Sequence, residues 1–300
     1  MKSKVRDLRE IVGEIPNSGA NIAIGGFAIT RNPMAFVFEL IRQGKRDLTV
    51  YQIVGGMELD ILVGAGLVKR LEYSAGSLDR FGRLERVNEA IDRGLIDVRE
   101  YSGLSISLRF LAGSMGIPFI PTKCLLGTDM LRILLERGDD SVKVESSPFD
   151  GERYVYLRAL QPAFAVIHAQ YSDEKGNVII EGPYWDVELA KSAKKLFVTV
   201  EQVVSNEFIK RYPEKVIIPS VYVSAIAEVP FGAYPTAVYR CYDYDKDMLT
   251  EYARISKDKA EFDKFLKDYV LETKDFNEFL EKVAGVERLC KIKADPVYGY

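Results

Sequence analysis

Two glycines directly after a predicted buried strand form the feature of this sequence most suited to chemistry. The stretch runs Asn21-Ile-Ala-Ile-Gly-Gly-Phe27, and a predicted helix begins at Pro33 behind the N-cap Asn32. Glycines let the backbone approach a ligand with N–H groups free to donate, and the helix adds its positive end. The pattern predicts a small-ligand loop at the carboxyl end of a strand. A plain strand-to-helix turn is the alternative, because the sequence has neither Gly-x-Gly-x-x-Gly nor a phosphate loop ending in Gly-Lys-Ser/Thr.

Side chains that usually carry catalysis are scarce. His168 is the only histidine, so a His-rich metal cluster is impossible and a Ser-His-Asp triad could form only around this ring. Its position in an apolar run favours a hydrogen-bonded, half-buried histidine. The cysteines Cys124, Cys241 and Cys290 stand far apart without a CxxC pair, which indicates neither a zinc site nor a disulfide framework. We expect Cys124, in an apolar context, to be an inert buried thiol.

The elements that must position the loop alternate between short apolar runs and helical patterns. This alternation predicts an α/β fold with an open, mostly parallel sheet flanked by helices. The predicted strands are residues 21–24, 48–54, 71–74, 96–101, 164–171, 178–180, 196–200 and 221–229, with a short extended piece at 117–120. The predicted helices are residues 33–43, 58–65, 83–92, 104–112, 129–137 and 187–193.

The last part of the chain has a different character. It is dense in charge and helical, with one apolar stripe formed by Phe262, Phe265, Leu266 and Tyr269. We expect residues 1–244 to form the α/β domain and residues 245–300 to form a C-terminal helical extension packed on it. A partner-binding arm is the alternative for this extension.

Composition excludes several classes of protein. The chain has 300 residues, 47% of them hydrophobic, with 41 Lys and Arg against 44 Asp and Glu and a formal charge of −3. Near-balanced charge argues against nucleic-acid and anionic-membrane binding, and no apolar run approaches the roughly 20 residues of a membrane span. The first twelve residues alternate charged and aliphatic side chains, unlike a signal peptide, so we expect a cytoplasmic protein.

The loop and the stretches after it resemble family I CoA-transferases. The family's first signature is Asn or Asp, an aliphatic run, Gly-Gly-Phe, and Pro six residues after the Phe, as in Asn21–Pro33. Arg31 departs from it, since the family usually has Gly there. The order of further motifs is similar to the A (alpha) subunit of glutaconate CoA-transferase: Gly55-Gly56, Gly64-Ala-Gly66, Ser77-Leu-Asp79, Ser147-Pro-Phe149, Pro162 to His168, Gly176-Asn177, Glu201 to Val204 and Pro230 to Pro235.

The resemblance implies half of an enzyme. Such enzymes use a glutamate that attacks an acyl-CoA thioester, giving an acyl-glutamyl anhydride and then a glutamyl-CoA thioester. In the two-subunit branch this glutamate lies on the B (beta) subunit in a Ser-Glu-Asn-Gly type motif, which this chain lacks. We therefore expect no catalytic residue in this chain, a B-subunit partner in an A2B2 heterotetramer, coenzyme A as a substrate, and no metal or other cofactor.

The expected substrate and CoA contacts come from the loops after the strands. They are Gly25, Gly26, Phe27, Arg31, Gly55, Gly56, Ser77, Ser102 and Gly103. Arg31 could clamp a substrate carboxylate, which would suit a dicarboxylic acyl group, or it could be a solvated arginine. Ser77 and Asp79 could line the pocket or cap a helix. We expect Tyr234, Tyr239, Tyr242 and Tyr244 to serve packing rather than chemistry.

Two other reactions and one non-catalytic role stay open. A related branch hydrolyses steroid-ring CoA thioesters and has an acidic residue after the fourth strand. That position aligns with Gly103 here, and Glu100 is the nearby acid. A third branch decarboxylates an acyl-CoA, and its distinguishing residue lies in the other subunit. The third possibility is a metabolite-binding protein on the same fold without catalysis.

Overall fold

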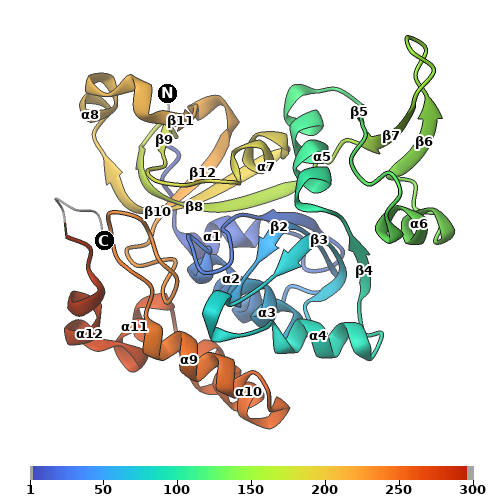
Figure 1. Cartoon of the computed structure of the whole chain (residues 1–300). Helices are drawn as coiled ribbons and strands as arrows, with labels where there is room; N and C mark the ends of the chain where they lie inside the picture. Colours follow the sequence, from blue (N-terminus) through green and yellow to red (C-terminus); the bar gives the residue numbers. More distant parts are fainter. Residues whose placement is uncertain (1–2, 296–300) are drawn as a thin grey trace.

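A nine-stranded sheet forms the centre of the computed structural model, which describes residues 3–295 (Figure 1). Its main path runs β11-β9-β8-β1-β2-β3-β4, and β10 pairs with both β8 and β12. All pairs are parallel except β8–β9 and β9–β11. The strands are β1 (Asn21–Ile24), β2 (Leu48–Gly55), β3 (Val68–Gly76), β4 (Asp97–Glu100), β8 (Phe164–Asp173), β9 (Val178–Ile179), β10 (Lys195–Val204), β11 (Val216–Ile218) and β12 (Val223–Glu228). The predicted open, mostly parallel sheet is confirmed.

Helices cover both faces of this sheet. Strand alternation sends Ile22 and Ile24 of β1 into one hydrophobic cluster and Ala23 into the other. The first cluster also holds α1 (Leu8–Gly13), α2 (Met34–Arg42) and α3 (Met57–Gly64), and α4 (Glu85–Asp92) packs on α3. The second holds α5 (Gly103–Met115) and α7 (Val187–Ser192). A short α8 (Asn206–Arg211) follows β10.

The C-terminal helices lie against α2 and α3. They are α9 (Lys246–Ile255), α10 (Lys259–Phe265), a π-helical turn (Leu266–Leu271), α11 (Phe276–Val283) and α12 (Gly285–Ile292). Phe38 of α2 packs against Phe276 and Phe279, with ring centroids 5.5 and 4.8 Å apart. This cover contributes to the burial of every residue of α2 from Met34 to Ile41. The boundary at residue 244 stays a prediction, because one hydrophobic cluster spans it.

A small second sheet forms an arm that projects from the body (Figure 1). It consists of β5 (Phe119–Thr122), β7 (Arg153–Arg158) and β6 (Val142–Ser146), in the order β5-β7-β6, with α6 (Asp129–Glu136) beside it. The sequence predicted the helix and the extended piece but not this separate sheet. Among the helices of residues 3–295, none combines the length and the apolar character that a membrane crossing requires.

Candidate functional site

The loops that carry the predicted site residues meet along the carboxyl edge of the parallel strands. The Gly25–Arg31 loop follows β1, Gly55 ends β2 and Gly56 is the N-cap of α3, Ser77 follows β3, and Ser102 and Gly103 lie between β4 and α5, at the start of that helix. The Ser77 N–H donates to the Gly55 carbonyl at 3.0 Å, which joins two of these loops. The structure thus brings the predicted residues to one edge, while their contact with a ligand stays a prediction.

The glycines let these loops pack against one another. A Cβ on Gly56 would lie 1.8 Å from the carbonyl oxygen of Ala28, and one on Gly26 would lie 2.7 Å from Asn32 Oδ1. Gly26 also has φ = 94°, in the left-handed region that favours glycine. The close approach that requires glycine here is therefore between two segments of this chain.

The N–H groups of the first loop are already bonded, which corrects the expectation of free donors. Gly25 donates to the Val166 carbonyl at 2.8 Å, Gly26 to Asp186 Oδ2 at 3.2 Å, and Phe27 to the Thr30 carbonyl at 2.9 Å. In the first turn of α2, Ala35 donates to the Gly232 carbonyl at 2.9 Å. Pro33 occupies the N-cap position, and Asn32, predicted as the N-cap, bonds elsewhere. The loop could therefore contact a ligand through its surface shape, but these backbone N–H groups are not free to donate to it.

Arg31 is buried and paired within the chain. Its Nη2 lies 2.9 Å from Asp186 Oδ1, its Nη1 lies 3.2 Å from Asp186 Oδ2, and Nη1 also donates to the His168 carbonyl at 3.0 Å. Both side chains of the pair are only 2% exposed. Arg31 is therefore not a solvated arginine, and its fork cannot clamp a substrate carboxylate unless Asp186 moves. A role of Arg31 in ligand binding stays a prediction. In that role Arg31 would act indirectly, by holding the loop in its shape.

Glu58, on α3, ties the first two loops together. Its carboxylate accepts hydrogen bonds from the side chains of Asn32 and Gln52 and from the Gly56 N–H, the last at 3.0 Å. Complete burial raises the pKa of Glu58 from 4.5 to about 7, although the bonds from Gly56 and Gln52 favour the ionised form. Asn32 also donates to the Ala28 carbonyl at 2.9 Å, so one buried network fixes both loops.

A second buried network holds the loop that covers this edge. His168 is fully buried rather than half-buried, and its Nε2 and Nδ1 lie 2.6 Å from Glu201 Oε1 and 2.8 Å from Thr199 Oγ1. Glu201 also accepts from the Tyr242 hydroxyl and the Phe231 N–H, both at 2.7 Å. The only histidine therefore anchors the 229–245 loop, and the hydrogen-bonded interpretation of it is confirmed.

The two predicted serines have local structural partners. Ser77 Oγ accepts from the Asp79 N–H at 2.8 Å in the turn before the short 3-10 helix Asp79–Phe81, whose N-cap position is Leu78, so neither Ser77 nor Asp79 is the N-cap of that helix. Ser102 Oγ is the N-cap of α5, accepts from the Ser105 N–H at 3.1 Å, and lies 3.2 Å from the half-buried thiol of Cys124. Gly103 is exposed at the start of α5. Lining of the ligand pocket by Ser77, Ser102 and Gly103 stays a prediction.

A cavity of about 320 Å³ opens beside the first loop. Its lining comes from three segments: Phe27, Thr30 and Arg31; Pro183 and Trp185; and Ala237, Tyr239, Tyr242 and Asp243. The predicted tyrosines differ in surroundings. Tyr234 is buried and donates to Asp245, and Tyr242 donates to Glu201, whereas Tyr239 is 37% exposed at the cavity.

The sequence did not point to Asp186, Glu58 or Glu201 as partners of the loops. Asp186 lies 155 residues from Arg31, and Glu201 lies 33 residues from His168. No local pattern connects such distant residues. Asp186, which bonds to Gly26 and Arg31 of the first loop, and Glu58, which bonds to the neighbouring Asn32, are both buried and hydrogen-bonded, so neither is an open nucleophile.

Comparison with known proteins places the chain in a family. The family model described as "Coenzyme A transferase" matches residues 7–229. The chain is 36% identical to the A subunit of glutaconate CoA-transferase from Acidaminococcus fermentans, over 99% of this chain and 97% of that one. It is 31% identical to the A subunit of 3-oxoadipate CoA-transferase from Pseudomonas knackmussii (92% and 97%) and to the cholesterol ring-cleaving hydrolase IpdA subunit of Rhodococcus jostii (91% and 94%).

Solved structures agree with this relationship. The crystal structure of glutaconate coenzyme A-transferase from Acidaminococcus fermentans superposes with a TM-score of 0.94 at 34% identity, over 99% of this chain and 98% of that one. A variant of the decarboxylase AibA/AibB superposes with a TM-score of 0.78 at 32% identity, over 88% and 99%. The chain therefore belongs to the coenzyme A transferase family, as an A subunit of the family I type.

Proposed function

We propose that this chain is the A subunit of a heteromeric, cytoplasmic CoA-transferase that moves CoA between an acyl-CoA and a carboxylic acid. A dicarboxylic acid is one candidate acceptor. The observation that carries the proposal is the similarity to glutaconate CoA-transferase over nearly the whole of both chains, at a TM-score of 0.94. The relatives that are themselves named as A subunits imply a partner, for which we propose a B subunit in an A2B2 assembly.

The nucleophile in this proposal comes from the partner. Its glutamate would attack the thioester carbonyl and release the CoA thiolate, leaving an acyl-glutamyl anhydride. The thiolate would then attack the glutamyl carbonyl and release the original acid, leaving a glutamyl-CoA thioester. Passing CoA to the acceptor acid repeats these two steps in reverse order. The buried, bonded state of Asp186 and Glu58 supports a nucleophile from another chain.

In this proposal the chain contributes one rigid side of the active site. The Arg31–Asp186 pair and the Glu58 network fix the loops after β1 and β2 from the inside, so their outer surface keeps one shape. Preorganised walls of this kind hold the reacting groups in place and exclude water from an anhydride that water would otherwise hydrolyse. The proposed contacts to the acyl group and CoA are those of Gly25, Gly26, Phe27, Arg31, Gly55, Gly56, Ser77, Ser102 and Gly103.

Hydrolysis and decarboxylation are the second candidates, because relatives at 31% and 32% identity carry those names. The acid expected for the hydrolytic branch aligns with Gly103, and Glu100 lies at the end of β4, three residues earlier. This argues for transfer over hydrolysis. A binding protein without catalysis is the remaining alternative.

The deciding experiment is purification of the tagged chain from its own cells, followed by native mass spectrometry and a transfer assay. We expect a stoichiometric companion with a Ser-Glu-Asn-Gly-like motif, and CoA transfer that requires both chains and an acceptor acid. Release of free CoA or carbon dioxide without an acceptor would favour the hydrolase or the decarboxylase. A chain that stays alone at every concentration, or that transfers CoA by itself, would refute the half-enzyme proposal.

A further inference from the structure

A cavity of about 630 Å³ lies at the amino edge of the parallel strands, at the opposite end of the sheet from the glycine loops. We call it the amino-edge cavity. Its floor comes from three adjacent strands: Asn21 of β1, Tyr51 of β2, and Arg70 and Glu72 of β3. Its volume lies within the range of ligand pockets, which is about 300–1,000 Å³. The cavity is therefore large enough for a small metabolite.

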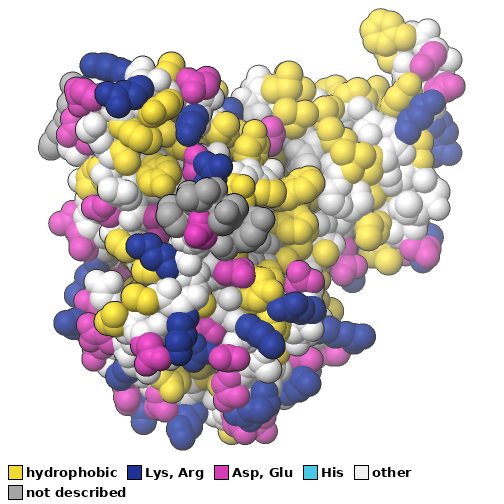
Figure 2. Space-filling view, turned by 60° about the vertical axis from the view of Figure 1, so that its left-hand side comes forward, with side chains coloured by type: hydrophobic (Ala, Val, Ile, Leu, Met, Phe, Trp, Pro, Cys, Tyr) yellow, Lys and Arg dark blue, Asp and Glu magenta, His cyan; other side chains and the backbone are white. Residues whose placement is uncertain are grey.

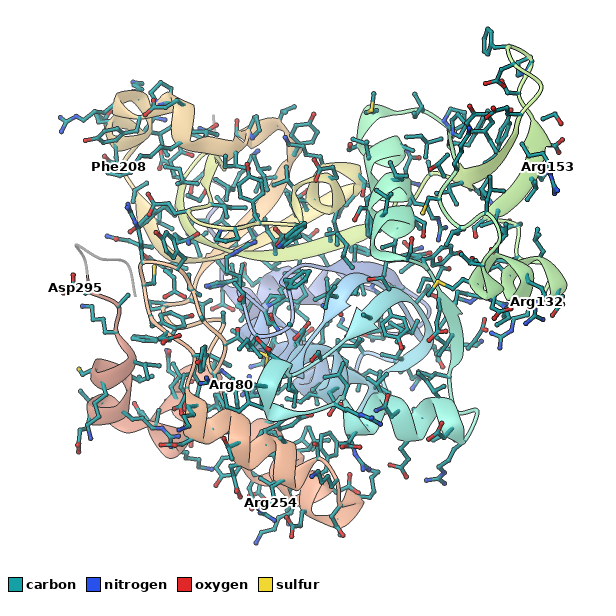
Figure 3. All side chains as sticks on the ribbon, viewed as in Figure 1. Arg80, Arg132, Arg153, Phe208, Arg254 and Asp295 are labelled. Atoms are coloured by element: carbon teal, nitrogen blue, oxygen red, sulfur yellow. The ribbon has the colours of Figure 1, made fainter. Side chains whose placement is uncertain are left out.

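Helix α5 and the arm complete the walls of this cavity. Arg109 of α5 and residues 116–118 after that helix form one wall, and Lys194 lies just before β10. Residues 139–141 of the arm and residues 158–161, which lead from the arm back to the main sheet, form another wall. Arg132 and Arg153, labelled in Figure 3, mark the arm. The cavity thus lies where the arm meets the main sheet.

Arg109 is a buried guanidinium with one nitrogen left for a ligand. Its side chain is only 4% exposed. Its Nε donates to the Arg158 carbonyl at 3.0 Å, and its Nη1 donates to Glu72 Oε2 at 2.8 Å. The guanidinium carbon lies 4.5 Å from the centre of the Tyr101 ring, which fixes the group from one side. Among residues 3–295, none accepts a hydrogen bond from Nη2. Because a buried donor is unfavourable without an acceptor, Nη2 favours an acceptor inside the cavity.

Three further donors of the lining have no acceptor within the described part of the chain. They are the Tyr51 hydroxyl, Asn21 Nδ2 and Lys194 Nζ. The amide of Asn21 is held in place, because its Oδ1 accepts from the Ala163 N–H. Burial and the nearby Glu72 raise the pKa of Tyr51 above 10, so this hydroxyl keeps its proton and can donate at neutral pH.

The carboxylates that line the cavity already have cationic partners. The three pairs are Glu72 with Arg109, Asp139 with Arg99, and Asp140 with Arg158. Arg70 likewise pairs with Asp97 at 2.8 Å. Among the charged side chains of the lining, this leaves Lys194 as the one without an ion pair. A ligand that complements this cavity therefore brings hydrogen-bond acceptors and negative charge.

We propose that the amino-edge cavity is a second binding site of this chain, which takes a short dicarboxylate and is separate from the site at the carboxyl edge. One carboxylate group accepts from Arg109 Nη2 and the Tyr51 hydroxyl, and the other faces Lys194 at the exposed rim. A phosphate concentrates its charge on one group, which the neighbouring Glu72 would repel more strongly than a single carboxylate. Two separated carboxylates spread the charge over the donors that the cavity offers.

The surface argues for a small anion rather than a polyanion such as nucleic acid. On the face shown in Figure 2, Lys and Arg in dark blue are intermixed with Asp and Glu in magenta, without a broad basic area. The exposed arginines of the cavity, Arg70 and Arg158, are also paired with carboxylates. The available donors lie inside the cavity, where a small ligand can reach them.

Calorimetric titration of the full chain tests this proposal. The probes are malonate, succinate and glutarate, with inorganic phosphate and the neutral succinamide as comparisons. We expect one dicarboxylate to bind per chain and its affinity to fall as the salt concentration rises. We expect phosphate to bind more weakly than the best dicarboxylate and succinamide not to bind.

Two variants locate the site while leaving the buried Arg109 in place. Tyr51→Phe keeps the ring and removes the hydroxyl, and we expect it to weaken binding of the best dicarboxylate by about 10-fold. Lys194→Gln should weaken it by about 3-fold, because this lysine is exposed. The matched controls are Tyr73→Phe, in the hydrophobic cluster on the other face of the sheet, and Lys69→Gln, at an exposed position outside the lining. Both controls should bind like the wild type, and circular dichroism establishes that each variant is folded.

Three results would overturn the inference. The first is that none of the three dicarboxylates binds, and the second is that phosphate binds more tightly than all of them. The third is that Tyr51→Phe and Lys194→Gln both bind like the wild type, because the dicarboxylate would then occupy another site, such as the carboxyl edge. None of these measurements requires a companion chain or CoA transfer, so this inference and the proposed function can fail independently.

Discussion

Replacing Glu58 by Gln tests the central feature of the edge, a buried carboxyl group that joins two loops. Burial raises the pKa of Glu58 from 4.5 to about 7. Because the folded state holds this proton more tightly than the unfolded state, the stability that the neutral carboxyl contributes is complete below pH 4.5. That contribution is lost as the pH rises through about 7. The glutamine variant has no such proton to lose.

The size of the effect follows from the two pKa values. At about 1.4 kcal/mol per pH unit, the difference between 4.5 and about 7 corresponds to about 3 kcal/mol. About 2 to 3 kcal/mol of this is lost between pH 5 and pH 8. Asp60, whose pKa burial raises to about 7, contributes a similar loss, but it is present in both proteins and cancels in their difference.

The assay is urea unfolding of wild type and Glu58→Gln at pH 5 and at pH 8. Any change in hydrogen bonding to Asn32, Gln52 and Gly56 shifts the variant by the same amount at both pH values. The wild type loses stability as Glu58 ionises, and the variant does not. We therefore expect the difference in unfolding free energy, variant minus wild type, to be about 2 to 3 kcal/mol larger at pH 8 than at pH 5. Glu281→Gln, at an exposed position on α11, is the control and should show no such gain.

A constant difference between wild type and Glu58→Gln at both pH values would refute this reasoning. It would mean that Glu58 has the same charge in the folded and unfolded chain over this range. The three hydrogen bonds that it accepts would then outweigh its burial.

Three further predictions concern the packing of the edge and its cover. Asp186→Leu should cost about 3–5 kcal/mol in unfolding free energy because it leaves Arg31 buried without its partner, and the double variant Arg31→Met/Asp186→Leu should cost less than the sum of the costs of Arg31→Met and Asp186→Leu. If the double variant cost as much as the two single variants together, Arg31 and Asp186 would not interact. Gly56→Ala should lower the melting temperature and disturb CoA transfer, since its Cβ would meet the Ala28 carbonyl, whereas Gly103→Ala, with its nearest atom at 3.9 Å, should be neutral or stabilise α5 by up to about 1 kcal/mol. Equal effects of the two would contradict the loop-packing argument. Phe279→Ala should destabilise the protein by about 3–5 kcal/mol in chemical denaturation, because its ring packs on Phe38, while Phe149→Ala should stay within about 0.5 kcal/mol; a small loss for Phe279→Ala would show that the C-terminal helices are not part of the core.

Local sequence patterns were enough to predict most of the elements of the main sheet. The alternation of apolar runs and helical patterns predicts β1, β2, β3 and β4 with the helices between them, because each pattern depends on residues only a few positions apart. The same local information placed the glycine loops at the ends of strands. It did not predict the separate β5-β7-β6 sheet, whose strands come from residues 119–122, 142–146 and 153–158.

The tertiary structure decided which partners these residues contact. Gly25 and Gly26 suggested a ligand-facing backbone, yet their N–H groups bond to Val166 and Asp186. Arg31 suggested a substrate clamp, yet the register of β1 beside β8 brings it to Asp186, 155 residues away. Every residue of α2 from Met34 to Ile41 is buried, and the C-terminal helices provide part of that cover by packing Phe276 and Phe279 on Phe38. The amino-acid sequence thus determined which elements form, because that depends on neighbours along the chain, whereas the pairing of buried charges depended on segments that meet only when the sheet and its covering helices pack together.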